Sequence, residues 1–196
     1  GLKRKDIDML KLGILGAGHI ATKLAGVFDF LRNEIVPYAV ASRTIEKAQA
    51  IAEKFNFTRA YGSYEELLSD PEVDVIYIAT PHSHHYEQML MCLEYGKHIL
   101  CEKPFTVNRR QAEIVFDKAR STNRFVCEAV WTRFMPCVKR IREILASGEL
   151  GDPRYIEASF CVPIGGKERM ARPELAGGAL LDLGIYPLNY AMLYFG

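Results

Sequence analysis

A glycine-rich segment near the start of the chain has the spacing of a phosphate-binding turn. Gly16 and Gly18 fit the glycines of a G-x-G-x-x-A pattern, and Ala21 fits its last small residue. The pattern follows an apolar run and opens a helical one, the context that separates a dinucleotide-binding turn from a chance match. We expect Gly16 to allow the tight turn and Gly18 to let the backbone approach a pyrophosphate. The candidate cofactor-binding residues here are Gly16, Ala17, Gly18, His19 and Ile20.

The residues after the next apolar run indicate which dinucleotide would bind. An NAD site usually has an acidic residue about 20 positions beyond the glycines, bonded to the ribose 2′-hydroxyl. This chain has Ser42 and Arg43 at that place and no acid before Glu46. Serine and arginine can donate hydrogen bonds to a 2′-phosphate, which a carboxylate would repel. The sequence therefore favours NADP over NAD; the alternative is that Arg43 is a solvated loop cation.

Three clustered histidines, His82, His84 and His85, raise the question of a metal site. A His-x-His pair binds zinc only where further ligands converge, and no third ligand is well placed nearby. The five cysteines are widely spaced and form no CxxC, so they predict neither a zinc ribbon nor a disulfide framework. We expect no metal, free thiols and a reducing, cytoplasmic environment.

Strand-like and helix-like patterns alternate through the first 130 residues and would position these groups. Near-continuous apolar strands separated by helices are typical of a parallel sheet covered on both faces, the doubly wound Rossmann arrangement of an α/β fold. Helix starts are predicted by the capping box Ser63-x-x-Glu66 and by Asn108. The predicted strands are Met9–Leu15, Ile35–Ala41, Arg59–Tyr61, Val73–Ala79, His98–Cys101 and Phe125–Val130.

The pattern changes after residue 130, which divides the chain into two predicted parts. Residues 1–130 would form the dinucleotide-binding domain, and residues 131–196 the start of an α+β domain with an antiparallel sheet. In the second part we expect a helix ending at Gly148 and a strand over Tyr155–Val162. Because one strand cannot make a sheet, we interpret the chain as a truncated version of a longer protein.

The composition excludes several classes of protein. The chain has 196 residues, of which 49% are hydrophobic and 25% charged, as in ordinary soluble globular proteins rather than disordered or fibrous ones. Its net charge of +1 argues against binding to nucleic acid through bulk charge. The most apolar stretch, residues 178–196, carries Asp182, Pro187 and Asn189, which argue against a membrane span.

Two further motifs resemble a known family. Thr80-Pro81-His82-Ser83-His84-His85 follows the fourth predicted strand and Glu102-Lys103-Pro104 follows the fifth, with Gly96-Lys97-His98 between them. In this order they strongly resemble the Gfo/Idh/MocA family of NAD(P)-dependent oxidoreductases, over essentially the whole chain. Residues 128–136 and Gly148-x-x-Gly151-Asp152 narrow the resemblance to the branch of dihydrodiol dehydrogenases, D-xylose 1-dehydrogenases and glucose–fructose oxidoreductase.

The resemblance implies a catalytic pair. Lys103 matches the lysine of that branch and Tyr186 its later tyrosine, where many other relatives have a histidine. Alcohol oxidation needs an O–H proton removed as hydride leaves carbon, and a neighbouring ammonium ion favours the phenolate form of a tyrosine, which can accept that proton. In reverse, Tyr186 would protonate the forming alkoxide while Lys103 stabilises its charge. Asp182, predicted one turn from Tyr186 on the same helix face, would orient the substrate or Lys103.

The resemblance also implies a cofactor site, a substrate pocket and a partner. Further residues would line the cofactor, with His85 supporting the loop beside the nicotinamide: Thr80, Pro81, His82, His85, Glu102 and Lys103. Trp131 and Phe160 would line the pocket of a sugar or diol substrate, although Trp131 could equally be an inter-domain packing residue. We expect a homodimer formed through the second domain. The competing hypothesis is a non-catalytic NAD(P)-binding sensor or transcriptional regulator of the same fold.

Overall fold

The apolar runs predicted as strands pair in parallel in one six-stranded sheet, in the order β3-β2-β1-β4-β5-β6. The computed structural model describes residues 9–31 and 33–195, so residues 1–8 of the predicted first domain lie outside the described residues. The strands are β1 (Leu10–Leu15), β2 (Ile35–Ala41), β3 (Arg59–Tyr61), β4 (Val75–Ile78), β5 (His98–Cys101) and β6 (Val126–Glu128). The order reverses between β1 and β4, so their carboxyl ends form the switch point where doubly wound folds bind ligands.

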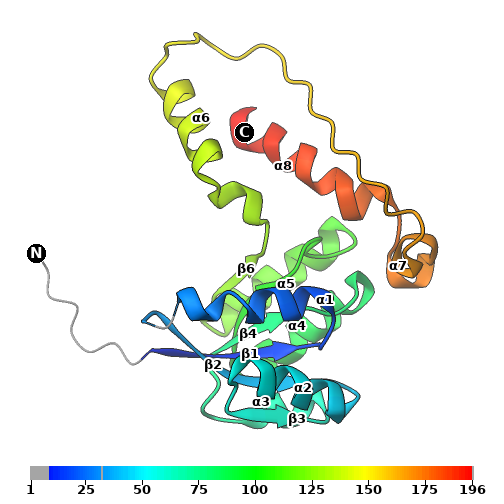
Figure 1. Ribbon diagram of the computed structural model, residues 1–196. Helices are drawn as coiled ribbons and strands as arrows, with labels where there is room; N and C mark the ends of the chain where they lie inside the picture. The colour runs from blue at the N-terminus through cyan, green and yellow to red at the C-terminus, as the bar shows by residue number, and fades with distance from the viewer. Residues whose placement is uncertain (1–8, 32, 196) are drawn as a thin grey trace, which may run out of the picture.

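Helices cover both faces of this sheet, as the alternating pattern predicts (Figure 1). One face packs against α3 (Tyr64–Ser69), α4 (His85–Glu94) and α5 (Arg109–Ser121). The other face packs against α1 (His19–Ala25) and α2 (Ile45–Phe55), beside the short 3-10 turn η1 (Phe28–Phe30). Both sets of contacts are apolar, and burial of this surface provides the main driving force for the fold.

Two predicted helix starts are present in the structure. Ser63 accepts a hydrogen bond from the backbone N–H of Glu66, and the Glu66 carboxylate accepts one from the Ser63 N–H, which together form the capping box of α3. Asn108 Oδ1 accepts from the N–H of Gln111 at 3.0 Å and caps α5. These side chains satisfy backbone donors that the first helical turn leaves without partners.

The regular elements described beyond β6 are all helices or helical turns. The elements are the 3-10 turn η3 (Trp131–Phe134), α6 (Pro136–Ala146), α7 (Glu168–Ala171), the 3-10 turn η4 (Pro173–Leu175), the π-helical turn η5 (Leu180–Gly184) and α8 (Ile185–Phe195). The helix predicted before Gly148 is α6. A further 3-10 turn, η2 (His82–His84), precedes α4. None of the helices in the described part of the chain is long and apolar enough to cross a membrane.

The strand predicted over Tyr155–Val162 is not formed. This segment lies in the long irregular stretch between α6 and α7, and the described residues form no second sheet (Figure 1). The physical reason is pairing: a strand needs a partner for its backbone N–H and C=O groups, and none lies beside this segment among the described residues.

The buried strands should dominate stability. We expect Ile76→Ala, which empties a fully buried site in β4, to lower the free energy of unfolding by about 2–5 kcal/mol. The matched control is Ile114→Ala on α5, where the side chain is 39% exposed and alanine favours the helix, so the loss should stay below about 1 kcal/mol. Urea denaturation of both variants measures the difference, and equal losses would contradict this assignment of the core.

Candidate active site

The glycine-rich turn follows β1 and has the geometry that its sequence predicts. Gly16 has a φ of +101°, and its N–H donates to Ala41 O at 2.9 Å. A Cβ at Gly16 would lie 3.0 Å from the backbone oxygen of Ala79, so a side chain there would be strained in two ways. A Cβ at Gly18 would meet nothing within 4 Å, which leaves open space beside the backbone at the start of α1. The turn therefore fits the close approach of a dinucleotide.

Ser42 and Arg43, which follow β2, differ in their surroundings. Ser42 is buried, and its hydroxyl accepts a hydrogen bond from the N–H of Thr44 at 3.3 Å, so it stabilises the loop. Arg43 is exposed at the same edge of the sheet as the glycine turn. Of the two, Arg43 is the side chain that a bound 2′-phosphate could reach from solvent.

The three predicted catalytic residues converge. Lys103, just after β5, donates through Nζ to Asp182 Oδ1 at 2.7 Å and to the Asp182 backbone oxygen at 2.8 Å. The same Nζ lies 5.4 Å from the centre of the Tyr186 ring. All three side chains are largely shielded from solvent, and their exposed fractions are 13% for Lys103, 2% for Asp182 and 9% for Tyr186.

A π-helical turn carries the aspartate, where the four-residue spacing predicts ordinary helix. Asp182 lies in η5 and Tyr186 in the first turn of α8, and both still face Lys103. Such turns are rare and frequently occur at functional sites.

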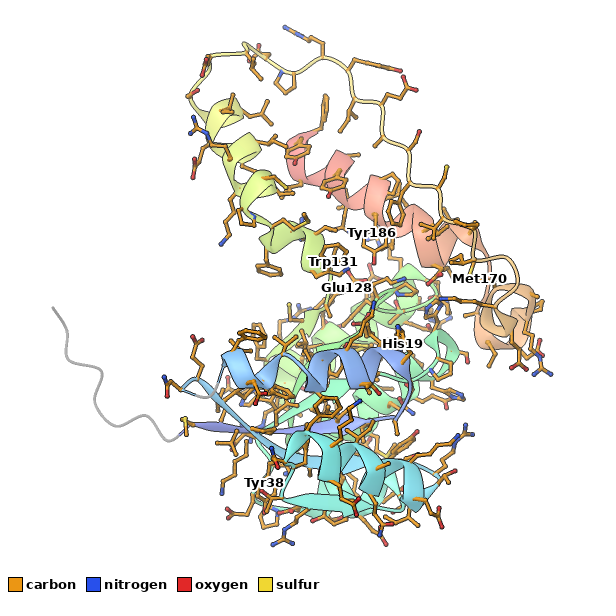
Figure 2. All side chains as sticks on the ribbon, viewed as in Figure 1. His19, Tyr38, Glu128, Trp131, Met170 and Tyr186 are labelled. Carbon is orange, nitrogen blue, oxygen red and sulfur yellow. The ribbon has the colours of Figure 1, made fainter. Side chains whose placement is uncertain are left out.

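Two aromatic side chains contact Tyr186, and Figure 2 shows one of them, Trp131, beside it. The Trp131 indole donates from Nε1 to the Tyr186 hydroxyl at 3.2 Å. The Phe160 ring packs edge-on against Tyr186 with the ring centres 4.9 Å apart. The structure thus brings both predicted pocket residues to the tyrosine, although the strand predicted around Phe160 is absent.

The predicted histidines point to different partners. His82 Nδ1 lies 3.3 Å from Ala176 O, and its Nε2 lies 3.6 Å from Asp182 Oδ1. Burial lowers the pKa of His82 to about 4, so it is neutral near pH 7. His85 is fully buried between the backbone oxygens of Pro104 and Thr80, and burial lowers its pKa as well. Within the described residues, no three His, Cys, Asp or Glu side chains are arranged to hold a metal ion.

Sequence reasoning missed a tyrosine that holds the glutamate of the Glu-Lys-Pro motif. The Tyr77 hydroxyl, buried on β4, donates to Glu102 Oε1 at 2.5 Å, and the other Glu102 oxygen accepts from the Lys103 N–H at 3.2 Å. Burial raises the pKa of both side chains. The sequence feature that could have predicted this contact is a tyrosine in an otherwise apolar strand, because a buried tyrosine hydroxyl needs a hydrogen-bond partner.

A second missed residue is Glu128, at the end of β6. Its Oε1 accepts from the Phe105 N–H at 2.8 Å, and burial raises the pKa of the carboxyl group. The sequence feature that could have identified Glu128 is its position as the only charged residue in the apolar run that predicts the sixth strand.

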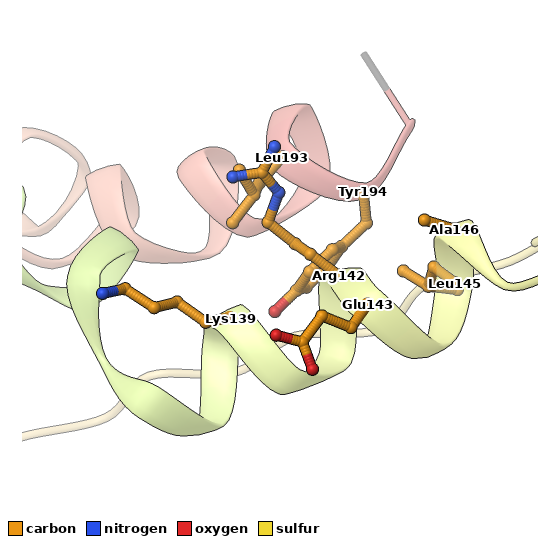
Figure 3. A pocket seen from close by; sticks show the side chains of 7 residues that line it. All are labelled: Lys139, Arg142, Glu143, Leu145, Ala146, Leu193 and Tyr194. Carbon is orange, nitrogen blue, oxygen red and sulfur yellow. The ribbon is translucent and has the colours of Figure 1, made fainter. Parts of the chain in front are cut away.

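A mostly apolar cavity of about 370 Å³ lies beside Glu128 and Trp131, and Trp131 in turn contacts Tyr186. Its walls come from α1, β4, β5, β6 and η3, and it includes the predicted site residues Ile20, Glu102 and Trp131. Another hollow, of about 580 Å³, lies between α6 and α8 and includes none of the predicted site residues (Figure 3). The first cavity is therefore the one that belongs with the candidate active site.

Comparisons with known proteins agree with this geometry. An oxidoreductase family profile, the Gfo/Idh/MocA NAD-binding Rossmann fold, matches residues 10–129, and the family's C-terminal domain profile matches residues 138–196. The chain belongs to the Gfo/Idh/MocA family.

Two relatives and one solved structure illustrate the likeness within the Gfo/Idh/MocA family. The trans-1,2-dihydrobenzene-1,2-diol dehydrogenases of Mus musculus and Sus scrofa are 44% and 43% identical to this chain over 188 residues. That alignment covers 95% of this chain and 56% of each relative. KijD10, a 3-ketoreductase from Actinomadura kijaniata solved with NADP and TDP-benzene, is 31% identical, with a TM-score of 0.86 over 96% of this chain and 58% of that one.

The burial of His82 has a consequence for pH dependence. The unfolded chain protonates this imidazole near pH 6.5, whereas the folded chain does so only near pH 4. The stability that the neutral imidazole contributes is complete above pH 6.5 and is lost as the pH falls toward 4. His82→Asn should abolish this loss, which amounts to about 3 kcal/mol.

Chemical denaturation between pH 7 and pH 4 measures the effect. The control His19→Asn changes an exposed histidine and should follow the wild-type curve. If His82→Asn also follows the wild type, His82 is not held neutral by burial.

Proposed function

We propose that this chain carries the cofactor site and the acid–base centre of an NADP-dependent oxidoreductase. The reaction would move a hydride between nicotinamide and a secondary alcohol, a sugar C1 hydroxyl or a trans-dihydrodiol. The observation that carries the proposal is the convergence of Lys103, Asp182 and Tyr186 beside a dinucleotide-binding turn. Because the chain spans 56% of the length of its dehydrogenase relatives, the activity is proposed for the protein as a whole.

The choice of NADP rests on the charge of Arg43 and on one similar solved structure. The exposed Arg43 guanidinium can pair with a 2′-phosphate, and the next acidic residue along the chain is Glu46. The KijD10 structure, which is similar to this chain, holds NADP. The open space at Gly18 would receive the pyrophosphate.

The proposed chemistry divides among the three converging side chains. A bound nicotinamide would accept or supply the hydride. The Tyr186 phenolate would take the substrate O–H proton during oxidation and so become the phenol, which would return the proton to the alkoxide during reduction. Lys103 would stabilise the negative charge that develops on oxygen, and Asp182 holds Lys103 in place through two hydrogen bonds. The Trp131 indole N–H orients the phenol, and Phe160 packs against its ring.

In this proposal the chain is divided near residue 130 into a cofactor-binding domain and a second domain. Residues 131–196 would form the start of the substrate-binding domain, through which the whole protein would form a homodimer. Trp131 and Phe160 are 57% and 44% exposed, so they would offer an aromatic surface to a sugar or diol beside the shielded Tyr186.

Cofactor choice can be tested at Arg43. We expect Arg43→Ala to weaken NADPH binding by about 1.5–3 kcal/mol, the value of a charged hydrogen bond, with little effect on NADH. The matched control is Arg120→Ala, which removes an exposed arginine at the far end of α5. Fluorescence titration of the reduced cofactors gives the dissociation constants. Equal loss for NADPH and NADH would show that Arg43 does not contact the 2′-phosphate.

Catalysis can be tested at Tyr186. We expect Tyr186→Phe to lower turnover by about 100-fold or more, because proton transfer is lost, while NADP affinity changes little. Tyr155→Phe, at an exposed tyrosine, is the control. Nicotinamide absorbance with a panel of pentoses, hexoses and diols measures turnover. Tight NADP binding by the whole protein without turnover of any of them would instead favour the sensor.

A further inference from the structure

The Glu128 side chain reaches from the sheet to the loop that carries Lys103. Glu128 is the last residue of β6 and lies opposite Cys101 in the parallel pairing of β5 and β6. Its Oε1 accepts from the N–H of Phe105 at 2.8 Å, two residues beyond Lys103. Phe105 is itself fixed, because it is 8% exposed and its ring stacks on Phe116 at 5.0 Å.

Side-chain hydrogen bonds hold the backbone at three consecutive residues, Lys103, Pro104 and Phe105. Each contact comes from a largely shielded side chain that borders the candidate active site. The contacts are Glu102 Oε2 to the Lys103 N–H at 3.2 Å, His85 Nδ1 to Pro104 O at 2.8 Å, and Glu128 Oε1 to the Phe105 N–H at 2.8 Å. A loop held in this way has little freedom to move its lysine.

Glu128 also adjoins the turn that carries the aromatic side of the site. The next residue, Ala129, donates its N–H to Cys101 O at 2.7 Å and accepts from the Trp131 N–H at 3.1 Å. The Trp131 indole in turn contacts the Tyr186 hydroxyl. One carboxylate therefore lies where the Lys103 loop, β6 and the Trp131 turn meet, and Figure 2 shows Glu128 below Trp131 and Tyr186.

The Glu128 carboxylate borders a mostly apolar cavity. Removing a charged group from water costs free energy unless hydrogen bonds offset it. An apolar residue at the end of β6 would avoid that cost, but it would leave the Phe105 N–H without this acceptor.

We propose that Glu128 is a positioning residue that fixes the Phe105 N–H and so aims Lys103 at Asp182 and Tyr186. Glu128 does not touch the reacting atoms. Its effect on rate rests on the proposed function, whereas its effect on the placement of Lys103 does not.

The test compares Glu128→Ala, which removes the acceptor, with Glu128→Gln, whose amide oxygen can still accept from Phe105. The matched control is Glu66→Ala, which removes a glutamate that also accepts backbone N–H bonds but caps the remote helix α3. The lysines are labelled by reductive ¹³C-methylation, which retains their charge. The Lys103 signal is identified by its loss in Lys103→Arg, and turnover and NADPH affinity are measured in parallel.

In Glu128→Ala we expect the Lys103 methyl signal to move toward that of solvent-exposed lysines. Turnover should fall by about 10- to 100-fold while the NADPH dissociation constant stays within about 3-fold. Glu128→Gln should restore both the signal and the rate, and Glu66→Ala should leave both unchanged.

Two results would overturn the proposal: an unmoved Lys103 signal in Glu128→Ala, or a Glu128→Gln variant as impaired as the alanine variant. If the wild-type protein binds NADPH but turns over no substrate, the proposed function fails. The lysine signal in that case still decides whether Glu128 positions Lys103.

Discussion

The contact between Lys103 and Asp182 is the interaction on which the rest of the site depends. It joins the loop after β5 to the π-helical turn before α8, across 79 residues of sequence. Both groups are largely withdrawn from water, where an unpaired charge is costly. Removal of one partner from a buried pair typically costs about 3–5 kcal/mol, because the other charge is left unpaired.

The side chains next to the Lys103–Asp182 ion pair do not compete with it. His82 approaches Asp182 from the η2 turn, but burial lowers its pKa to about 4, and a neutral imidazole does not compete with Lys103 as a cation. Tyr186 lies in the first turn of α8, directly after η5, with its ring beside the ammonium group. The site therefore joins a positive charge to a phenol whose hydroxyl accepts a hydrogen bond from Trp131, an arrangement that would suit the proposed acid–base chemistry on an alcohol.

The sequence predicts well those features that repeat along the chain or depend on near neighbours. The alternation of strand-like runs, most of them near-continuously apolar, with helical patterns predicted the six parallel strands. Ser63 and Asn108 predicted helix starts because caps act over three residues. The predictions failed where the local structure depends on a pairing partner that is distant in the sequence. Tyr155–Val162 has a strand-like composition, but composition says nothing about whether another strand lies beside it.

The candidate site shows the same division. Its members Lys103, Asp182 and Tyr186 could be named from motifs, and the structure brings them together. The supporting contacts of Tyr77 with Glu102 and of Glu128 with Phe105 could not be named, because they depend on the register between neighbouring strands and on side-chain direction.

A double-mutant cycle on Lys103 and Asp182, measured as NADP-dependent turnover by the whole protein, tests the central claim most directly. Lys103→Met and Asp182→Asn should each lower turnover by about 100-fold or more, and the double variant should be no worse than the poorer single variant. That result would show that the two residues act as one unit. Losses that multiply in the double variant, or a Lys103→Met variant with wild-type turnover, would contradict the account.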